Sequence, residues 1–461
     1  MPELSSESAV IDHNGISGTP GIYTRGYKAY VVGVLLLVYT SNFIDRTILS
    51  ALAEPIKNDL HLADWQIGVL GGLSFAVFYS ILGIPIARLS ERHNRTWIIS
   101  ISVAIWSGMT ALCGTAATYA QLLIYRVGVG VGEAGGTPPA QSIISDLYPP
   151  QNRSTVISIY MLGVPLGSLI GALIGGIVAE HWGWRAAFFV IGIPGLVLAL
   201  IVATTVKEPS RGQSEGIMET GAPPALMHVL RSLWTKKSVR HVFAGITIAS
   251  FVGYAMVAFT ASYFIRSHAF SVAQAGIIAG IIGGGSAAAG TFLGGFLSDK
   301  FGKRDRRWYV WVPALGLAIA APLYAIAYLS GDWRATAVLL IGPGIFHYMY
   351  LGPTYGIIQN MVGPRMRATA IAVLLLVVNL VGLGLGPPAL GLLSDFLATQ
   401  FLASGVENSI TLKDCTPDLA ICRQATANGL KFALAIFMAL FAWASLHYHF
   451  ASRRVNEDLL H

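Results

Sequence analysis

Residues 295–304 read GFLSDKFGKR, and residues 87–96 read ARLSERHNRT. Each stretch has a small residue, then Leu-Ser, an acidic residue, a basic residue and a basic cluster, and the two lie 208 positions apart. A second related pair follows, PPQNRST at 149–155 and GPRMRAT at 363–369. Because similarity at a long, nearly constant offset indicates duplicated units, the sequence predicts two halves repeated in parallel.

Long apolar stretches surround these loops. Of the 461 residues, 54% are hydrophobic and 11% are charged, whereas about 25% are charged in a typical soluble domain. An apolar stretch of about 20 residues is long enough to cross a bilayer as a helix. The sequence therefore predicts an all-α polytopic membrane protein with twelve spans, at 28–50, 65–86, 96–117, 119–147, 155–179, 184–205, 241–264, 271–297, 308–329, 335–362, 368–393 and 428–450.

A polar central segment separates six spans from the other six. Within it, apolar and basic residues over Leu226–Trp234 predict a helix that lies at an anionic membrane surface, with docking of a soluble partner as the alternative. The predicted division is a tail at 1–26, a six-helix bundle at 27–205, a linker at 206–240, a second six-helix bundle at 241–450 and a tail at 451–461.

Basic residues are distributed unevenly between the predicted loops. If both termini are cytoplasmic, 21 Lys and Arg residues lie inside and 7 outside, as the positive-inside rule requires. The net charge of +7 then matches an anionic leaflet and needs no nucleic-acid partner. Polar residues precede the first span, so we expect that span to be its own targeting signal. The expected location is the plasma membrane, or the inner membrane of a bacterium.

Four charged residues lie inside predicted spans. Asp45 and Arg46 belong to the first span, and Arg126 and Glu133 belong to the fourth. A charge at mid-membrane costs about 2.5–3.5 kcal/mol on insertion scales, so such residues usually face a partner or a watery cavity and mark an ion or substrate path. The alternative is a closed salt-bridge cluster that only fixes helix packing.

Helix geometry predicts how these four side chains are arranged. At about 1.5 Å per residue, Asp45 and Arg126 reach a similar depth in the outer half of the bilayer and should be able to pair. Glu133 lies on the same helix face as Arg126, about 10 Å deeper. Arg46 projects about 100° away from Asp45 and should face a different neighbour or the cavity.

These positions suggest roles. A buried carboxylate beside an arginine can change between protonated and ionised forms when the arginine moves or an anion binds. We therefore expect Asp45 and Glu133 to carry coupling protons. We expect Arg46 and Arg126 to hold an anionic headgroup or to pair with the carboxylates.

The second half contributes different candidates. Tyr254, His347, Tyr350 and Asn379 fall near the predicted midplane of their spans and could line a cavity opposite the charges. For His347, a packing role is the alternative. The many Phe, Leu and Val residues around them would suit the apolar part of an amphipathic substrate.

Other chemistry has little support in the sequence. We find no Walker sequence, HExxH motif or zinc-type Cys/His cluster, so ATP-driven transport and metal-dependent hydrolysis have no visible machinery, and we expect no metal or cofactor. Cys415 and Cys422 share the loop before the last span, which this topology places outside. They form either a disulfide or two unpaired thiols.

Six plus six spans in parallel repeat, with a central cytoplasmic loop, resemble the architecture of major facilitator transporters. The loop signature of that superfamily, G-x-x-x-D-R-x-G-R-K/R, matches the second copy well. In the first copy Ala87, Glu91 and Asn94 replace the expected Gly, Asp and Gly. In the superfamily this loop is a cytoplasmic latch between helices. The resemblance implies a cytoplasmic gate that includes Glu91, Arg92, Asp146, Arg153, Asp299, Lys300 and Arg367. Alternatively, the loop only fixes topology.

The resemblance narrows to the Spinster branch of that superfamily. It rests on Asp45-Arg46, on the run RVGVGVGEA from Arg126 to Ala134, and on DLYPPQNRS at 146–154. Spinster relatives are lipid transporters, some moving sphingosine-1-phosphate or lysophospholipids, with proton coupling proposed for members. The resemblance implies a monomeric, proton-coupled transporter that works by alternating access on an amphipathic anionic or zwitterionic substrate, such as a lysolipid or sphingoid phosphate.

Three alternatives stay open at this point. Within transport, the substrate could be a small organic anion, or a drug exchanged for protons. In a different class, the chain could be a non-transporting membrane receptor or scaffold, although the charged cluster argues against it. A membrane enzyme that uses Asp45 and Glu133 as paired acid and base is the third option, and we do not expect it.

Overall fold

The computed structural model describes residues 23–148, 156, 159–210, 225–362, 366–403, 415 and 419–458. Every regular element in these ranges is a helix. The first half contains α1 (Arg25–Leu60), α2 (Asp64–Gly71), α3 (Leu73–Arg92), α4 (Arg95–Cys113), α5 (Tyr119–Glu133), α6 (Thr137–Leu147) and α8 (Gly163–Thr205). The linker contributes α9 (Leu226–Thr235), which agrees with the helix predicted there.

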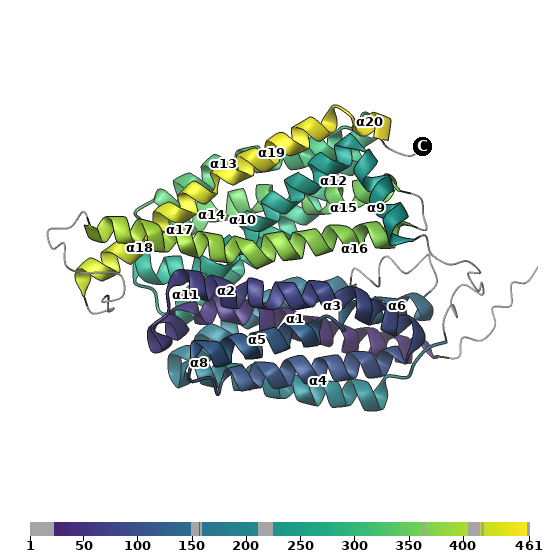
Figure 1. The fold of residues 1–461 in the computed structure, drawn as a ribbon, viewed down its shortest axis with the longest axis horizontal. Coiled ribbons are helices and arrows are strands. Elements are labelled where there is room, and N and C mark those ends of the chain that lie inside the picture. Colours follow the sequence, from purple (N-terminus) through teal and green to yellow (C-terminus); the bar gives the residue numbers. More distant parts are fainter. Residues whose placement is uncertain are drawn as a thin grey trace, which may run out of the picture.

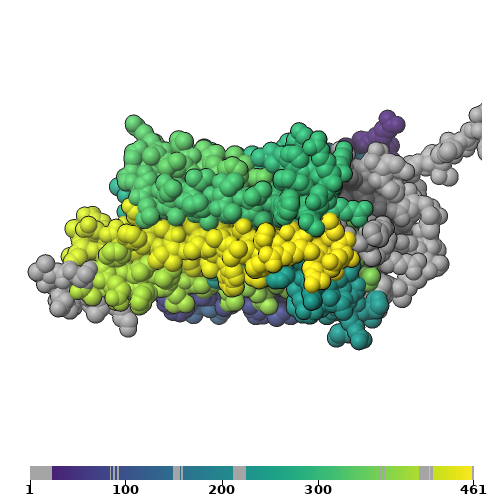
Figure 2. Space-filling view, turned by 90° about the horizontal axis from the view of Figure 1, so that it is seen from above, coloured from purple at the N-terminus to yellow at the C-terminus, as the bar shows by residue number. Residues whose placement is uncertain are grey.

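The second half contains α10 (Lys237–His268), α11 (Val272–Gly280), η1 (Ile281–Gly285), α12 (Ser286–Gly302), α13 (Trp308–Leu329), α14 (Trp333–Tyr348), α15 (Leu351–Asn360), α16 (Arg367–Val377), η3 (Val378–Leu383), α17 (Gly384–Ala403), α18 (Ala420–Phe437), α19 (Ala439–Ser452) and α20 (Val455–Asp458). The two halves lie against each other as two layers of helices (Figure 1). In the second layer, α18 and α19 run along the long axis of the molecule (Figure 2).

The helices account for the predicted spans. Ten helical stretches of the described chain are long and apolar enough to cross a membrane, judged by length and composition. One of them, 159–205, contains two predicted spans that join at Gly183. The φ of 82° at Gly183 is a left-handed conformation that glycine adopts without strain. The predicted fourth span is divided between α5 and α6, each shorter than 18 residues.

Local signals fix where the helices of the first half begin and end. Thr24 caps α1 by accepting a hydrogen bond from the Tyr27 backbone N–H, and Thr118 caps α5 in the same way through Gln121. His61, at φ 50°, ends α1. These caps satisfy backbone donors that a helix start leaves unpaired, and they set the depth of every later residue.

The two halves meet most closely toward the end of the molecule where α11 and α18 lie, away from α9 and α20 (Figure 1). We call it the outer end, following the predicted topology. There α2 packs on α17, and α8 packs on α11. A Cβ atom on Gly391 would lie 2.6 Å from the Asp64 carbonyl oxygen, and one on Gly276 would lie 2.6 Å from the Ala172 carbonyl oxygen. Both contacts therefore require glycine.

A disulfide links Cys415 and Cys422 near the same end. Of the two states that the sequence left open, the structure has the bonded one. The remaining cysteine, Cys113, is buried as a free thiol.

The glycine contact between α2 and α17 yields a prediction about stability. Gly391→Ala should cost about 1–3 kcal/mol, because the added methyl group meets backbone atoms that cannot move independently. Thermal unfolding of the purified protein should therefore shift to lower temperature. Gly342→Ala is the matched control, since a Cβ atom there meets nothing within 4 Å. Equal melting temperatures for the two variants would contradict the proposed contact.

Candidate functional site

Helices α1 and α5 bring the four charged residues of the first half together. Asp45 and Arg46 lie in the middle of the unbroken helix α1, while Arg126 and Glu133 lie seven residues apart on α5. The exposed fraction of Asp45, Arg126 and Glu133 is 1% each. Charged groups this deeply buried must be compensated by neighbouring charges or hydrogen bonds.

Arg46 pairs with Glu133. Its Nε donates to Glu133 Oε2 at 2.8 Å, and the Arg46 side chain is 17% exposed while that of Glu133 is 0% exposed. This contact agrees with the prediction that Arg46 projects away from Asp45, and the neighbour that it faces is Glu133. The pair is strong because both partners are charged and the carboxylate is desolvated.

Aromatic rings surround the same guanidinium. The Arg46 Cζ lies 5.1 Å from the ring centre of Phe43, 4.7 Å from that of Phe75 and 4.7 Å from that of Tyr79. Cations are attracted to aromatic faces at these distances. We call Arg46, Phe43, Phe75 and Tyr79 the arginine cage. It presents a partly accessible positive charge within an apolar wall.

Arg126 does not form the carboxylate pair that we predicted with Asp45. Its Nη1 donates to the Asp45 backbone oxygen at 3.2 Å, and its Nε donates to the Leu70 backbone oxygen at 3.4 Å. Among the described residues, no ion pair joins Arg126 to Asp45 within 4.0 Å. The prediction of a pair was wrong because equal depth does not determine how two helices are rotated about their axes.

Two buried carboxylate oxygens at the site, Asp45 Oδ1 and Glu133 Oε1, make no hydrogen bond of standard geometry with the described residues. A negative charge on such an atom is costly, and binding a proton removes that cost. Both residues are therefore chemically suited to take up and release protons.

The candidates of the second half lie in different surroundings. Tyr254 is half-buried on α10 and lies within electrostatic range of Arg46 in the other half. His347 is 2% exposed and lies among rings, with centre distances of 4.5 Å to Tyr348 and 4.5 Å to Phe441. Its two ring nitrogens make no hydrogen bond of standard geometry with the described residues.

The other two candidates of the second half are also buried. The Tyr350 hydroxyl is 3.2 Å from Ser250 Oγ. Asn379 lies in the wide helical turn η3, where it is 7% exposed. Of these four candidates, Tyr254 is therefore the one that we place near the charged residues of the first half.

Three of the predicted cytoplasmic gate residues have described side chains, and the contacts given for these side chains are with residues of the same half. Asp146 pairs with Arg95, which also binds Glu208 at 2.6 Å and is 1% exposed. Asp299 accepts a hydrogen bond from the Tyr309 hydroxyl at 3.1 Å. Lys300 lies 5.7 Å from the Phe296 ring centre. Arg153 lies outside the described residues, as do the side chains of Glu91, Arg92 and Arg367.

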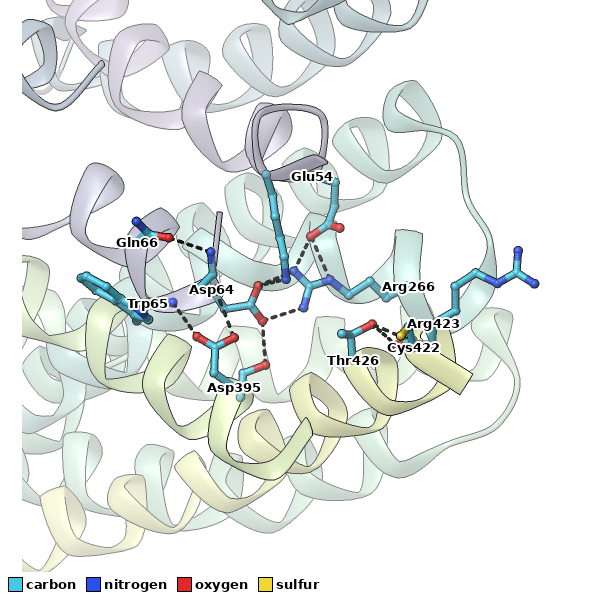
Figure 3. Close-up of polar contacts among 12 residues, drawn as sticks. Glu54, Asp64, Trp65, Gln66, Arg266, Asp395, Cys422, Arg423 and Thr426 are labelled. Atoms are coloured by element: carbon cyan, nitrogen blue, oxygen red, sulfur yellow. Dashed lines mark hydrogen bonds and ion pairs between the residues drawn. The ribbon is translucent and has the colours of Figure 1, made fainter. Parts of the chain in front are cut away.

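A second charged cluster, which the sequence analysis missed, joins the halves at the outer end (Figure 3). Arg266 of α10 donates to Glu54 at 2.9 and 2.6 Å, and to both Asp64 oxygens at 2.6 Å. Lys57 donates to Asp64 Oδ1 at 2.5 Å. Asp395 of α17 accepts from the backbone N–H groups of Asp64 and Trp65 at 3.1 and 3.0 Å. We call Glu54, Lys57, Asp64, Arg266 and Asp395 the outer cluster.

The sequence contained a signal for this cluster. Glu54 and Asp395 lie close to the ends of predicted spans, and Asp64 precedes one, so they resembled ordinary loop charges. Glu54 is however followed by a proline inside α1. Helix α1 continues to Leu60, so Glu54 lies within a helix and is 7% exposed. If the predicted first span had been extended past Pro55, Glu54 would have fallen inside it and would have been recognised as a buried acid.

Comparison with known proteins agrees with this architecture. Residues 35–382 match the family model described as Major Facilitator Superfamily. The chain is 33% identical to an MFS-type efflux pump of Mycolicibacterium smegmatis over 85% of this chain and 90% of that protein. It is 26% identical to Protein spinster of Drosophila melanogaster over 83% of this chain and 64% of that protein.

Solved structures include a bacterial homologue of the human lysosomal transporter Spinster in an inward-facing and unoccupied conformation. It is 37% identical, with a TM-score of 0.87, and the match covers 95% of this chain and 100% of that chain. The prediction from the repeated loops and the buried charges is therefore confirmed at the level of the family. This chain is a multi-pass membrane transporter, not an enzyme, and it belongs to the Spinster branch of the Major Facilitator Superfamily.

Proposed function

We propose that this transporter moves an amphipathic anionic or zwitterionic substrate, such as a lysolipid or sphingoid phosphate, by alternating access coupled to protons. The observation that carries the proposal is the arginine cage. A guanidinium binds a phosphate through two parallel hydrogen bonds. The rings of Phe43, Phe75 and Tyr79 around Arg46 offer apolar surface to the chain next to such a headgroup.

Substrate binding and proton binding are linked through Arg46. In the present arrangement, Arg46 is engaged by Glu133. An anionic headgroup that takes Arg46 leaves the fully buried Glu133 carboxylate without its cation, and a buried carboxylate in that state favours protonation. Asp45, whose buried Oδ1 makes no hydrogen bond of standard geometry within the described part of the chain, is a second proton carrier nearby.

Alternating access requires two bodies that separate at one end at a time. We assign these bodies to residues 27–205 and 241–450. The halves pack together at the outer end through glycine contacts and the outer cluster, which supports access from the inner side. We place both termini and α9 on the cytoplasmic side of the plasma membrane, with the transporter acting as a monomer.

A second candidate is efflux of a small organic anion or a drug in exchange for protons. The likeness to the efflux pump of Mycolicibacterium smegmatis favours it, and the arginine cage suits planar anions as well as phosphates. Thermal stabilisation by a panel of lysolipids, sphingoid phosphates, organic anions and drugs separates the two candidates.

Neutral substitutions test the proton carriers. We expect Asp45→Asn and Glu133→Gln each to remove the dependence of uptake on an imposed pH gradient, because an amide neither gains nor loses a proton. Uptake into proteoliposomes with and without the gradient is the measurement. The proton role is excluded if both variants respond to the gradient as the wild type does.

Removing the guanidinium tests the headgroup site. A hydrogen bond to a charged group contributes about 1.5–3 kcal/mol, so Arg46→Ala should weaken binding of an anionic amphiphile by at least about tenfold. Arg185→Ala is the matched control, because Arg185 also pairs with an acid, Asp59, and lies 4.2 Å from the ring centre of Trp184, but is 41% exposed. Binding to purified protein is measured by titration. Equal affinities for the two variants would exclude the cage as the headgroup site.

A further inference from the structure

The outer cluster has an imbalance of charge. It gathers three carboxylates, Glu54, Asp64 and Asp395, around two cations, Lys57 and Arg266 (Figure 3). With every group ionised, the cluster carries one excess negative charge. Glu54 is 7% exposed and Asp64 is 2% exposed, whereas Asp395 is half-buried. An uncompensated charge in so little water is expensive.

The excess charge belongs to Asp395. Arg266 engages Glu54 and Asp64, and Lys57 engages Asp64. In the described part of the chain, no lysine or arginine forms an ion pair with Asp395. Asp395 accepts instead from two backbone N–H groups at the start of α2. These donors stabilise a carboxylate less than a directly paired cation does. The Asp64 carboxylate repels Asp395, and Lys57, which is bound to Asp64, attracts Asp395 without pairing with it.

Other charged groups on the packed helices do not supply the missing cation. The side chain of Arg423 on α18 points away from the cluster in Figure 3. His268 of α10 has its Nε2 3.3 Å from the Tyr263 hydroxyl and interacts electrostatically with Lys431 and Asp332. Ser394, next to Asp395, donates its hydroxyl to Asp64 Oδ2 at 2.8 Å.

The cluster exists only while the halves touch at the outer end. Glu54, Lys57 and Asp64 belong to the first half, whereas Arg266 and Asp395 belong to the second. When the halves separate there, Asp64 keeps Lys57, and water solvates Asp395 as an ordinary ionised carboxylate. When the outer end closes, Asp395 again lies beside Asp64. Asp395 then has no cation paired with it within the described part of the chain.

We infer that closure of the outer end takes up one proton on Asp395, so that protons arriving from outside favour the outward-closed conformation. The proton passes from solvent to a carboxylate oxygen of Asp395, and no other bond changes. This inference rests on the proposed alternating access. It adds a proton site that is separate from Asp45 and Glu133.

The sign of the pH effect follows from linkage. Because the closed state binds one more proton than the open state, the ratio of closed to open molecules falls as pH rises. For one proton, the limit is about tenfold per pH unit. This direction suits a transporter that loads protons outside and then closes.

Spin labels at the outer ends of α1 and α17 test the inference in the full-length protein in lipid nanodiscs. Asn58→Cys and Gln400→Cys are exposed positions for the labels, and Cys113→Ser removes the free thiol. Electron–electron distance measurements over a pH series report the populations of closed and open molecules. In the wild type, the closed fraction should fall with pH at up to about tenfold per unit.

Asp395→Asn should remove this pH dependence, because asparagine binds no proton. Its NH2 group cannot accept from a backbone N–H as the second Asp395 oxygen does, so the closed fraction should be constant over the pH series and lower than in the wild type at low pH. Asp332→Asn is the matched control: Asp332 caps α14 through the Ala335 N–H at 3.0 Å and is exposed. It should behave as the wild type. A wild-type slope in Asp395→Asn, or a flat response in the wild type, overturns the inference.

Lys57→Gln supplies an independent readout. It raises the excess negative charge of the closed cluster from one to two, so closure should take up a second proton, and the slope should approach about a hundredfold per pH unit. An unchanged slope would contradict the charge count. Asp45→Asn and Glu133→Gln should keep the distance response even though they lose gradient-driven uptake. This difference separates a failure of the outer site from a failure of the proposed transport mechanism.

Discussion

The ion pair between Arg46 and Glu133 is the contact on which the account of this transporter depends. It places a positive and a negative group inside a helical bundle whose other residues are mostly apolar, where each charge alone would be costly. The two partners belong to different helices, α1 and α5, so the pair also fixes how these helices pack. Arg46 is partly accessible and Glu133 is not. We therefore propose that an incoming anion takes the arginine and leaves the acid to be protonated.

The charged groups form two clusters with different relations to the halves. The central cluster lies within the first half, and Tyr254 of the second half lies within electrostatic range of Arg46. The outer cluster joins the two halves, so it can persist only while they touch at that end. The central cluster is therefore suited to recognise cargo, whereas the outer cluster is suited to sense which end is closed. Glycine contacts such as Gly391 against Asp64 bring the backbones close enough for the outer hydrogen bonds to form.

Much of the fold could be predicted from the sequence, because apolar stretches of span length and repeated loops are local patterns. The depth of Asp45 and Arg126 also followed from helix rise. Their rotation did not, and Arg126 binds the backbone oxygen of Asp45 instead of its carboxylate. The rotation of a helix about its axis depends on how it packs against other helices, and the sequence of one span contains no information about that packing.

The sequence analysis did not predict the outer cluster, for a related reason. Acids near the ends of spans resemble solvated loop residues until a distant partner such as Arg266 is placed beside them. The buried Arg95, which binds both Asp146 and Glu208, is a similar case. Such long-range partners depend on the arrangement of whole helices. The predicted midplane positions of His347 and Tyr350 likewise did not distinguish a cavity wall from an aromatic core.

The central claim is that an anion on Arg46 forces a proton onto its former partner. The most direct measurement is the number of protons bound when a purified, solubilised transporter binds an anionic amphiphile, obtained by calorimetric titration in buffers of different ionisation enthalpy. The account predicts uptake of up to about one proton per bound substrate near neutral pH, as linkage between the two sites requires. Binding that is tight but exchanges no proton at any pH would contradict it.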